Sequence, residues 1–415
     1  MSPVTHRFGW YLALLQLFFT LCWTVYAIYL PKLAADAGLL PGAIILLLML
    51  DQAIFTVCDF ATGVAADKVT RVLGRIGVFV VALTIVSCAA FLLLPYVASA
   101  GATALIAVTV VWTVTSSALR APPLMLLGKY AAKPALPYLS GLALLGIGIA
   151  GAVAPYLAVT LRNTDPRLPF ALASIVLALT ALGIIVAERR LAAQPKPEAK
   201  PETEPAPARA FGTLTTPAIV FALGMIVLAL GYQIHFALES APLYLRFARP
   251  DQLVWLMPVF WIGFNIAMFP AGLIVKKFGG YAVMGAAALI GALAILAAHG
   301  AQGLELLVAA QLASGAAWGA ILMSAFTVAF TVGANGGEGR MSGLLFSTLA
   351  LATLARMAAV ASGVSGDASL RAVLQWLPVA CWTLAGAALL YLAIAGLRRW
   401  TGLGRGAKES AKETG

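Results

Sequence analysis

Acidic side chains recur within a long apolar stretch of this 415-residue sequence. Asp51, Asp59 and Asp67 are eight residues apart along residues 42–67, so they drift slowly around one face of a helix. A charged group at bilayer depth costs about 2.5–3.5 kcal/mol on insertion scales, so such residues usually have a function. Asp51, near mid-depth, is the leading candidate for a proton or cation site, the alternative being a hydrogen-bonded structural acid. Asp59 is expected to be the acid of a structural ion pair.

Two arginines also fall within apolar stretches. Arg120 lies in "SSALRAPPLMLLGKY", where Pro122 and Pro123 interrupt helical hydrogen bonding. We expect Arg120 to pair with Asp59, and binding of an anionic substrate is the alternative. Arg356, in "TLARMAA", has no acid at helical spacing, so its partner must come from another helix or from the substrate.

A third polar group is the stretch "GYQIHFALESAP", which contains Gln233, His235 and Glu239. His235 and Glu239 are four residues apart, close enough on a helix to share a proton or a hydrogen bond. The three residues are candidates for binding substrate or protons, with satisfied packing residues as the alternative.

The sequence offers little for metal, redox or nucleophilic chemistry. The four cysteines, Cys22, Cys58, Cys88 and Cys381, lie in apolar runs without paired spacing, which favours packing over disulfides or zinc. No phosphate-binding Gly-x-x-x-x-Gly-Lys-(Ser/Thr) stretch is present, and only three histidines occur, scattered along the chain. We therefore expect no metal, no cofactor and no enzyme activity.

The elements that position these residues are membrane helices. The chain is 62% hydrophobic and 10% charged, with a mean hydropathy of +0.96. Apolar runs of about 20 residues recur along it, each long enough to cross the hydrocarbon core as a helix. The sequence predicts an all-α membrane protein with twelve spans near 9–31, 42–65, 76–98, 102–128, 137–161, 169–187, 217–245, 252–275, 281–299, 304–332, 341–363 and 372–396.

Basic residues predict the orientation. With cytoplasmic termini, 19 of the 27 Lys and Arg residues fall on the inner side, 6 on the outer side and 2 within spans. This bias is typical of an inner-membrane protein with both termini in the cytoplasm. The net charge of +11 is thus an orientation signal, and we expect no nucleic-acid partner.

The spans divide into two halves. Residues 188–210, "ERRLAAQPKPEAKPETEPAPARA", lack large apolar side chains apart from Leu191 and predict a solvated linker. We therefore expect six-helix bundles at 1–187 and 213–397, a linker at 188–212 and a cytoplasmic tail at 398–415. Gly63-x-x-x-Asp67-Lys68 after span two and Gly272-x-x-x-Lys276-Lys277 after span eight occupy equivalent positions, which indicates internal duplication.

These features resemble the major facilitator superfamily. Its signature after span two is Gly-x-x-x-Asp-(Arg/Lys)-x-Gly-(Arg/Lys); Gly63, Asp67, Lys68 and Arg71 match it, while Thr70 stands where Gly is usual. The resemblance implies that this motif latches the two halves together in the outward-facing state.

The resemblance also implies that spans one, four, seven and ten line a central cavity. That position adds Trp23, Tyr26 and Trp318 to the candidate substrate-binding residues, beside Arg120, His235 and Glu239.

The function expected is secondary active transport of a small organic solute by alternating access, driven by protons or another ion. The two buried arginines favour an anionic solute. The alternatives are a proton-driven drug or metabolite efflux antiporter and, in another class, a polytopic membrane enzyme. The expected partners are the solute, the coupling ion and lipid, and a monomer is expected.

Overall fold

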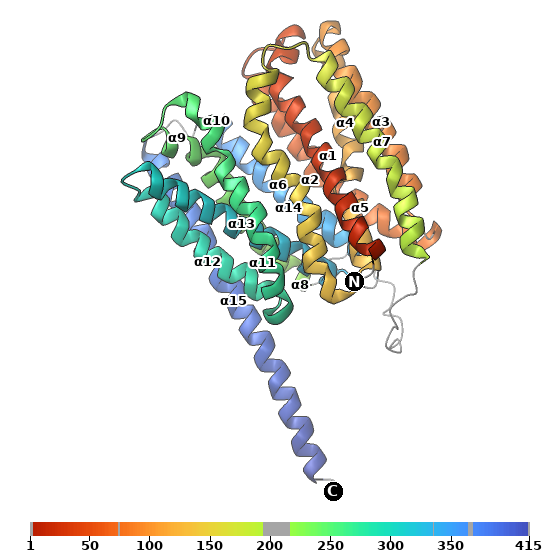
Figure 1. The fold of residues 1–415 in the computed structure, drawn as a ribbon, viewed down its shortest axis with the longest axis vertical. Coiled ribbons are helices and arrows are strands. Elements are labelled where there is room, and N and C mark those ends of the chain that lie inside the picture. Colours follow the sequence, from red (N-terminus) through yellow and green to blue (C-terminus); the bar gives the residue numbers. More distant parts are fainter. Residues whose placement is uncertain (1–2, 74, 194–215, 335, 364–367, 414–415) are drawn as a thin grey trace.

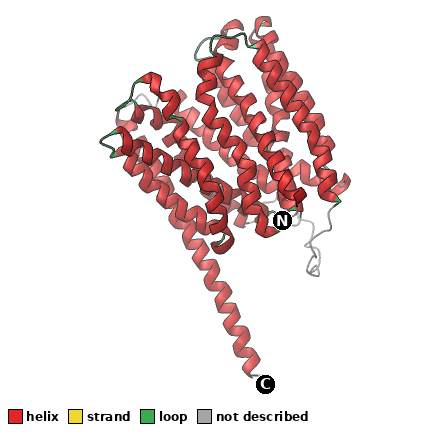
Figure 2. Cartoon of the chain, in the orientation of Figure 1, coloured by secondary structure: helices red, strands yellow, loops and turns green. Residues whose placement is uncertain are grey.

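The fold is entirely helical over the residues described by this computed structural model. These are residues 3–413 without 74, 194–215, 335 and 364–367. Within them no residue forms a strand, and twelve helical segments are long and apolar enough to cross a membrane (Figure 2). The prediction of an all-α membrane protein with twelve spans is confirmed.

The first half contains six spans, with span four divided between two helices. Its main helices are α1 (Pro3–Asp36), α2 (Ala43–Leu73), α3 (Gly77–Val97), α4 (Ala102–Ser116), α5 (Ala121–Tyr130), α6 (Leu136–Leu161) and α7 (Arg167–Ala192). Short 3₁₀ turns join them: η1 (Ala98–Ala100), η2 (Ser117–Leu119) and η3 (Lys133–Ala135).

The second half also contains six spans, and span seven changes helix type midway. Its elements are α8 (Thr216–Ile234), the π-helical η4 (His235–Glu239), α9 (Ser240–Tyr244), the 3₁₀ turn η5 (Pro250–Gln252), α10 (Leu253–Leu256), α11 (Pro258–Phe278), α12 (Gly280–His299), α13 (Leu304–Val332), α14 (Glu338–Ala361) and α15 (Ala368–Glu413). The helix α15 projects beyond the other helices and includes residues expected to form a tail (Figure 1).

The start of the expected linker is part of span six. Residues 188–192 extend α7, and Glu188 is buried although the sequence placed it in solvent. Its carboxylate accepts hydrogen bonds from the backbone N–H groups of Ile76, at 2.9 and 3.1 Å, and Gly77, at 2.7 Å, where α3 begins. A carboxylate at a helix N-terminus satisfies free amides and the helix dipole, which compensates its burial. Most of the remaining linker lies outside the described residues.

The two halves meet along α2 with α14 and along α6 with α11. At the α2–α14 contact, Gly63 faces Gly339 and Gly343, and a Cβ atom on Gly63 would lie only 2.2 Å from the Gly339 carbonyl oxygen. Small residues allow membrane helices to approach backbone to backbone. This contact lies at the end of α2 that leads into the loop before α3, and we call that side of the bundle the loop 2–3 face.

Candidate functional site

A central cavity of about 300 Å³ lies between the two halves. Each half contributes a polar group to it: Arg120 and Gln52 from the first, Gln233 and Thr353 from the second. Eight aromatic side chains make up much of the remaining wall: Phe19, Trp23, Phe55, Tyr232, Trp261, Trp318, Phe326 and Phe346. A mostly apolar concave site with a few polar groups is the usual form of a small-molecule site.

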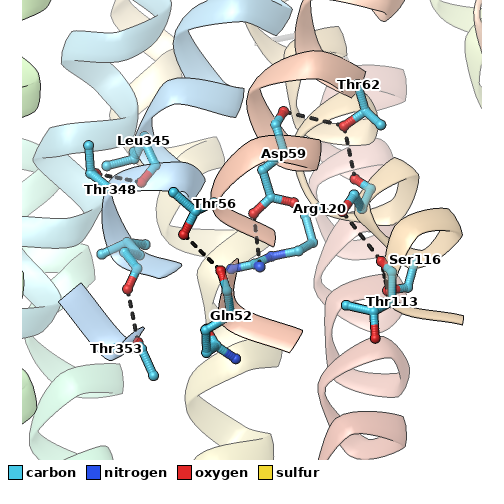
Figure 3. Close-up of polar contacts among 12 residues, drawn as sticks. Gln52, Thr56, Asp59, Thr62, Thr113, Ser116, Arg120, Leu345, Thr348 and Thr353 are labelled. Atoms are coloured by element: carbon cyan, nitrogen blue, oxygen red, sulfur yellow. Dashed lines mark hydrogen bonds and ion pairs between the residues drawn. The ribbon is translucent and has the colours of Figure 1, made fainter. Parts of the chain in front are cut away.

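Arg120 is the cation of the first half at this cavity. Its Nη1 lies 2.9 Å from Oδ2 of Asp59, which is completely buried, while the Arg120 side chain remains 15% exposed (Figure 3). The guanidinium carbon lies 4.5 Å from the ring centre of Phe55 and 4.9 Å from that of Phe346. Arg120 is therefore held by one acid and by cation–π contacts with both halves of the protein.

The interruption of the helix in span four places Arg120 at the depth of the cavity. Arg120 separates the 3₁₀ turn η2 from α5, and Pro122 and Pro123 stand in the first turn of α5, where their missing N–H groups are tolerated. The side chain of Gln16, which also lines the cavity, donates to the Leu119 carbonyl at 3.1 Å. A hydrogen bond from span one thus satisfies one backbone carbonyl, that of Leu119, next to the interruption.

Arg356 is connected to the same cavity through Gln233. The Arg356 Nε donates to Gln233 Oε1 at 3.0 Å, and Gln233 Nε2 donates to the Thr353 hydroxyl at 2.8 Å. Among the described residues no carboxylate lies within ion-pairing distance of Arg356. Beside the cavity there are thus two guanidinium groups, Arg120 and Arg356, and one carboxylate, Asp59. In the described part of the chain one positive charge is therefore uncompensated.

Asp51 does not line the central cavity. It is completely buried, and its two carboxylate oxygens accept hydrogen bonds from Tyr26, at 2.9 Å, and Thr113, at 2.8 Å. The neighbouring Gln52 faces the cavity instead. Tyr26 is also fully buried and lies behind Trp23, whose ring centre is 5.4 Å away. Trp23 lines the cavity, and the Asp51 network is one layer deeper.

The second half supplies an aromatic wall. Tyr232 stacks on Trp318 with ring centres 4.4 Å apart and planes inclined by 4°. Trp261 completes the wall 6.5 Å from Tyr232. Stacked aromatic rings form a rigid surface suited to a flat apolar group.

His235 and Glu239 lie away from this cavity. Glu239 lines a second cavity of about 420 Å³ together with His299 from the end of α12. The Nδ1 atom of His235 lies 3.9 Å from Glu239 Oε2, and His299 Nε2 lies 3.3 Å from the same oxygen. The structure thus separates Asp51 and Glu239, which the sequence placed together among the central candidates.

The residues of the signature motif lie at the loop 2–3 face. Asp67 accepts hydrogen bonds from the backbone N–H groups of Gly339 and Arg340, both at 2.8 Å, at the first turn of α14. Lys68 and Arg71 are exposed on the same end of α2. The carboxylate of one half therefore caps a helix of the other half in this conformation.

Several lining residues were not among the sequence candidates. Gln52 and Phe55 follow Asp51 on α2, Tyr232 adjoins Gln233, and Thr353 lies one turn before Arg356. Their helical spacing from predicted residues was a usable signal. His299 had no such signal, because it ends a separate span that is otherwise apolar.

Comparisons with known proteins agree with this architecture. The family model described as Major Facilitator Superfamily matches residues 12–355. The search of curated proteins found no match.

Solved structures share the fold at low sequence identity. The Escherichia coli fucose:proton symporter is 13% identical, with a TM-score of 0.67 over 94% of this chain and 99% of that chain. A human organic anion transporter is 15% identical, with a TM-score of 0.66 over 95% and 99%. A bacterial homologue of the iron transporter ferroportin, in an outward-facing state, is 15% identical, with a TM-score of 0.71 over 94% and 100%.

Proposed function

Because the chain belongs to the major facilitator superfamily, we propose that it is a secondary active transporter of a small organic anion, working by alternating access and coupled to protons. The observation that carries the proposal is the central cavity, where aromatic rings from both halves face a common space and the Arg356 guanidinium, which has no acidic partner among the described residues, stands behind the lining residue Gln233. Sites between two halves that move relative to one another are where secondary transporters bind their solutes.

The cavity wall favours a solute with a flat apolar body and one anionic group. The Tyr232–Trp318 stack offers the apolar surface. Arg120 is already neutralised by Asp59, so the Gln233 amide, which lines the cavity and is held by Arg356, is the group available to an anion, with the positive charge of Arg356 behind it. A positive charge beside a hydrogen-bond donor in a mostly apolar cavity favours an anionic group such as a carboxylate. A human organic anion transporter has the same fold.

We propose Asp51 as the proton site. Its network of Tyr26 and Thr113 lies directly behind Trp23 and Gln52 of the cavity wall. A movement of α1 against α2 would change the hydroxyl groups that stabilise the carboxylate, and thus its affinity for a proton. A proton symporter among the solved structures shares the fold.

The first experiment identifies the solute. Purified protein is screened for thermal stabilisation by aromatic carboxylates, by their amides and by organic cations. We expect carboxylates alone to stabilise it, and Arg356→Gln to weaken their binding by about tenfold, the loss of a charge-assisted hydrogen bond. Arg249→Gln, an exposed arginine outside the cavity, is the matched control. Equal stabilisation by carboxylates and cations would contradict the anion proposal.

The second experiment tests coupling with the carboxylate so identified. Proteoliposomes are assayed for accumulation under an imposed pH gradient and for exchange without one. We expect Asp51→Asn to abolish accumulation and to retain exchange. Accumulation at the unmodified rate by Asp51→Asn would contradict proton coupling through this acid.

A further inference from the structure

We propose that His235, Glu239 and His299 form a binding site for a divalent transition-metal ion such as Zn²⁺, separate from the central cavity. The site joins span seven to the end of span nine on the face opposite loop 2–3. It does not depend on the proposed solute or on proton coupling, and it differs from the sequence-based expectation that the protein holds no metal.

The geometry brings three suitable ligand atoms together. Nδ1 of His235, Oε2 of Glu239 and Nε2 of His299 all lie within 4.8 Å of one another. Glu239 Oε2 is the common member, at 3.3 Å from His299 and 3.9 Å from His235. In a tetrahedral zinc site, ligand bonds of about 2.0–2.1 Å place the donor atoms about 3.4 Å apart. Of the three separations, the one between His299 and Glu239 already has this value, and small side-chain rotations must shorten the other two, which lie within 4.8 Å.

None of these three atoms has a hydrogen-bond partner among the described residues, although each is buried. The side chains are 1%, 14% and 6% exposed for His235, Glu239 and His299. Leaving a buried polar atom unpaired costs about 1–3 kcal/mol, so three at one point require an explanation. A shared proton would satisfy Glu239 and one histidine and leave the other unpaired. A metal ion satisfies all three.

Neighbouring residues orient the ligands. The other ring nitrogen of His235, Nε2, lies 3.2 Å from Gln311 Oε1, which also accepts the Ser240 hydroxyl at 3.3 Å. Because that oxygen can only accept, Nε2 carries the hydrogen and Nδ1 presents its lone pair to the metal. Metal-binding histidines are commonly held in this manner by a second hydrogen bond.

The backbone is also adapted to the site. His235 to Glu239 form a π-helical turn, closed by the Ser240 N–H donating to the His235 carbonyl, five residues earlier. Such turns are rare and occur frequently at functional sites. On the other side, Arg246 Nη1 donates to the His299 carbonyl at 3.2 Å and fixes the end of α12.

The donor set indicates the class of metal. Two imidazoles and one carboxylate suit Zn²⁺ and neighbouring divalent metals, whereas Mg²⁺ and Ca²⁺ prefer oxygen alone. The adjoining cavity of about 420 Å³ leaves room for a water molecule in a fourth position. Because His235 follows the cavity residue Gln233 by two positions, a metal here also restrains the wall of the central cavity.

The test is metal binding by the purified, tag-free protein after treatment with a chelator. We expect one equivalent of Zn²⁺ per chain and, with Co²⁺ as a probe, the visible absorption of a tetrahedral centre. His299→Gln and Glu239→Gln should each weaken binding at least tenfold and remove that absorption. His6→Gln changes the only histidine outside the cluster and is the matched control, with binding unchanged.

A variant with a different metal ligand distinguishes loss of a ligand from loss of the fold. His299→Cys should bind Co²⁺ again, with the added charge-transfer band of a thiolate ligand. The proposal is overturned if unmodified protein binds no Zn²⁺, or if the cluster variants and His6→Gln lose binding equally. These measurements do not involve transport, so their failure would leave the transport proposal unaffected.

Discussion

The end of span two and the end of span eight carry equivalent glycine motifs but pack against the other half in different ways. In the first half, Gly63 meets the backbone of α14, with no room for a Cβ atom, and Asp67 caps that helix. In the second half, the nearest atoms to a Cβ on Gly272 belong to Pro137 of α6, at 3.7 Å, which is ordinary contact distance. Lys276 and Lys277 are exposed there.

The carboxylate of Asp67 explains why the two motifs pack differently. Asp67 finds backbone amides at the start of a helix, an arrangement that favours a negative charge. Lys276 stands at the position equivalent to Asp67 and cannot accept a hydrogen bond, so it cannot cap α6 in this way. Instead a cavity of about 430 Å³ opens between the halves, lined by Lys276 and Lys133 among others.

We infer that one of these two equivalent contacts acts as a latch. The α2–α14 contact combines glycine packing with charge-assisted hydrogen bonds, while among the described residues the α6–α11 contact has neither at this face. We therefore propose that opening of the loop 2–3 face is controlled mainly by α2 and α14.

Three substitutions test this, and all use a cysteine at Met125 as reporter, on a chain whose four native cysteines are replaced by alanine. Met125 is 1% exposed and touches Gly339.

The largest effect is expected for Gly63→Val. Even its Cβ would overlap the Gly339 carbonyl, so α2 and α14 must separate. Overpacking of this kind costs about 1–3 kcal/mol, which would shift the population towards the form open at loop 2–3 by about five- to 150-fold. Maleimide labelling of the reporter should accelerate accordingly. Val57→Leu, on the lipid-exposed side of α2, is the control, and unchanged labelling in Gly63→Val would break the latch interpretation.

Asp67→Asn should have a smaller effect in the same direction. The amide retains one acceptor oxygen and loses the charge, so one of two backbone N–H groups loses its partner. Hydrogen bonds to charged groups contribute about 1.5–3 kcal/mol, and the retained acceptor keeps the loss at the lower end of this range, so labelling should increase about tenfold. Asp251→Asn, on an exposed turn, should label like the unmodified protein. If both variants label at that rate, Asp67 serves only packing.

The smallest effect is expected for Gly272→Ala. The added methyl group fits without displacing Pro137, and alanine stabilises a helix by about 0.5–1 kcal/mol relative to glycine. Labelling of the reporter should change by less than about twofold, within the usual range for neutral substitutions, while the melting temperature rises slightly. Labelling as fast as in Gly63→Val would show that the two copies act alike.

The sequence was sufficient for features that depend on local periodicity. Twelve apolar runs predicted the spans, and Asp59 and Arg120, two opposite charges within spans, were expected to pair, as they do in the structure. The motif at Asp67 was expected to join the two halves, but that its carboxylate caps α14 required the structure. Gly339-x-x-x-Gly343 was an overlooked signal for it, because this spacing is typical of closely packed membrane helices.

Features that arise between distant spans could not be predicted. Asp51 is enclosed because Tyr26 and Thr113 from two other helices reach its oxygens. The cluster around Glu239 depends on a π-helical turn and on His299 from span nine. Glu188 was read as part of a polar segment, and only the packing of α7 beside α3 turns it into a helix cap.

We propose that the two halves move as rigid bodies around the cavity and open it to one face at a time. Paired spin labels test it most directly, one pair at Val72 and Phe278 on the loop 2–3 face and one at Leu40 and Gln302 on the opposite face, all four exposed positions. We expect Asp67→Asn to lengthen the distance within the first pair and to shorten it within the second. Distances that change in the same direction at both faces, or at neither, would contradict alternating access by this protein.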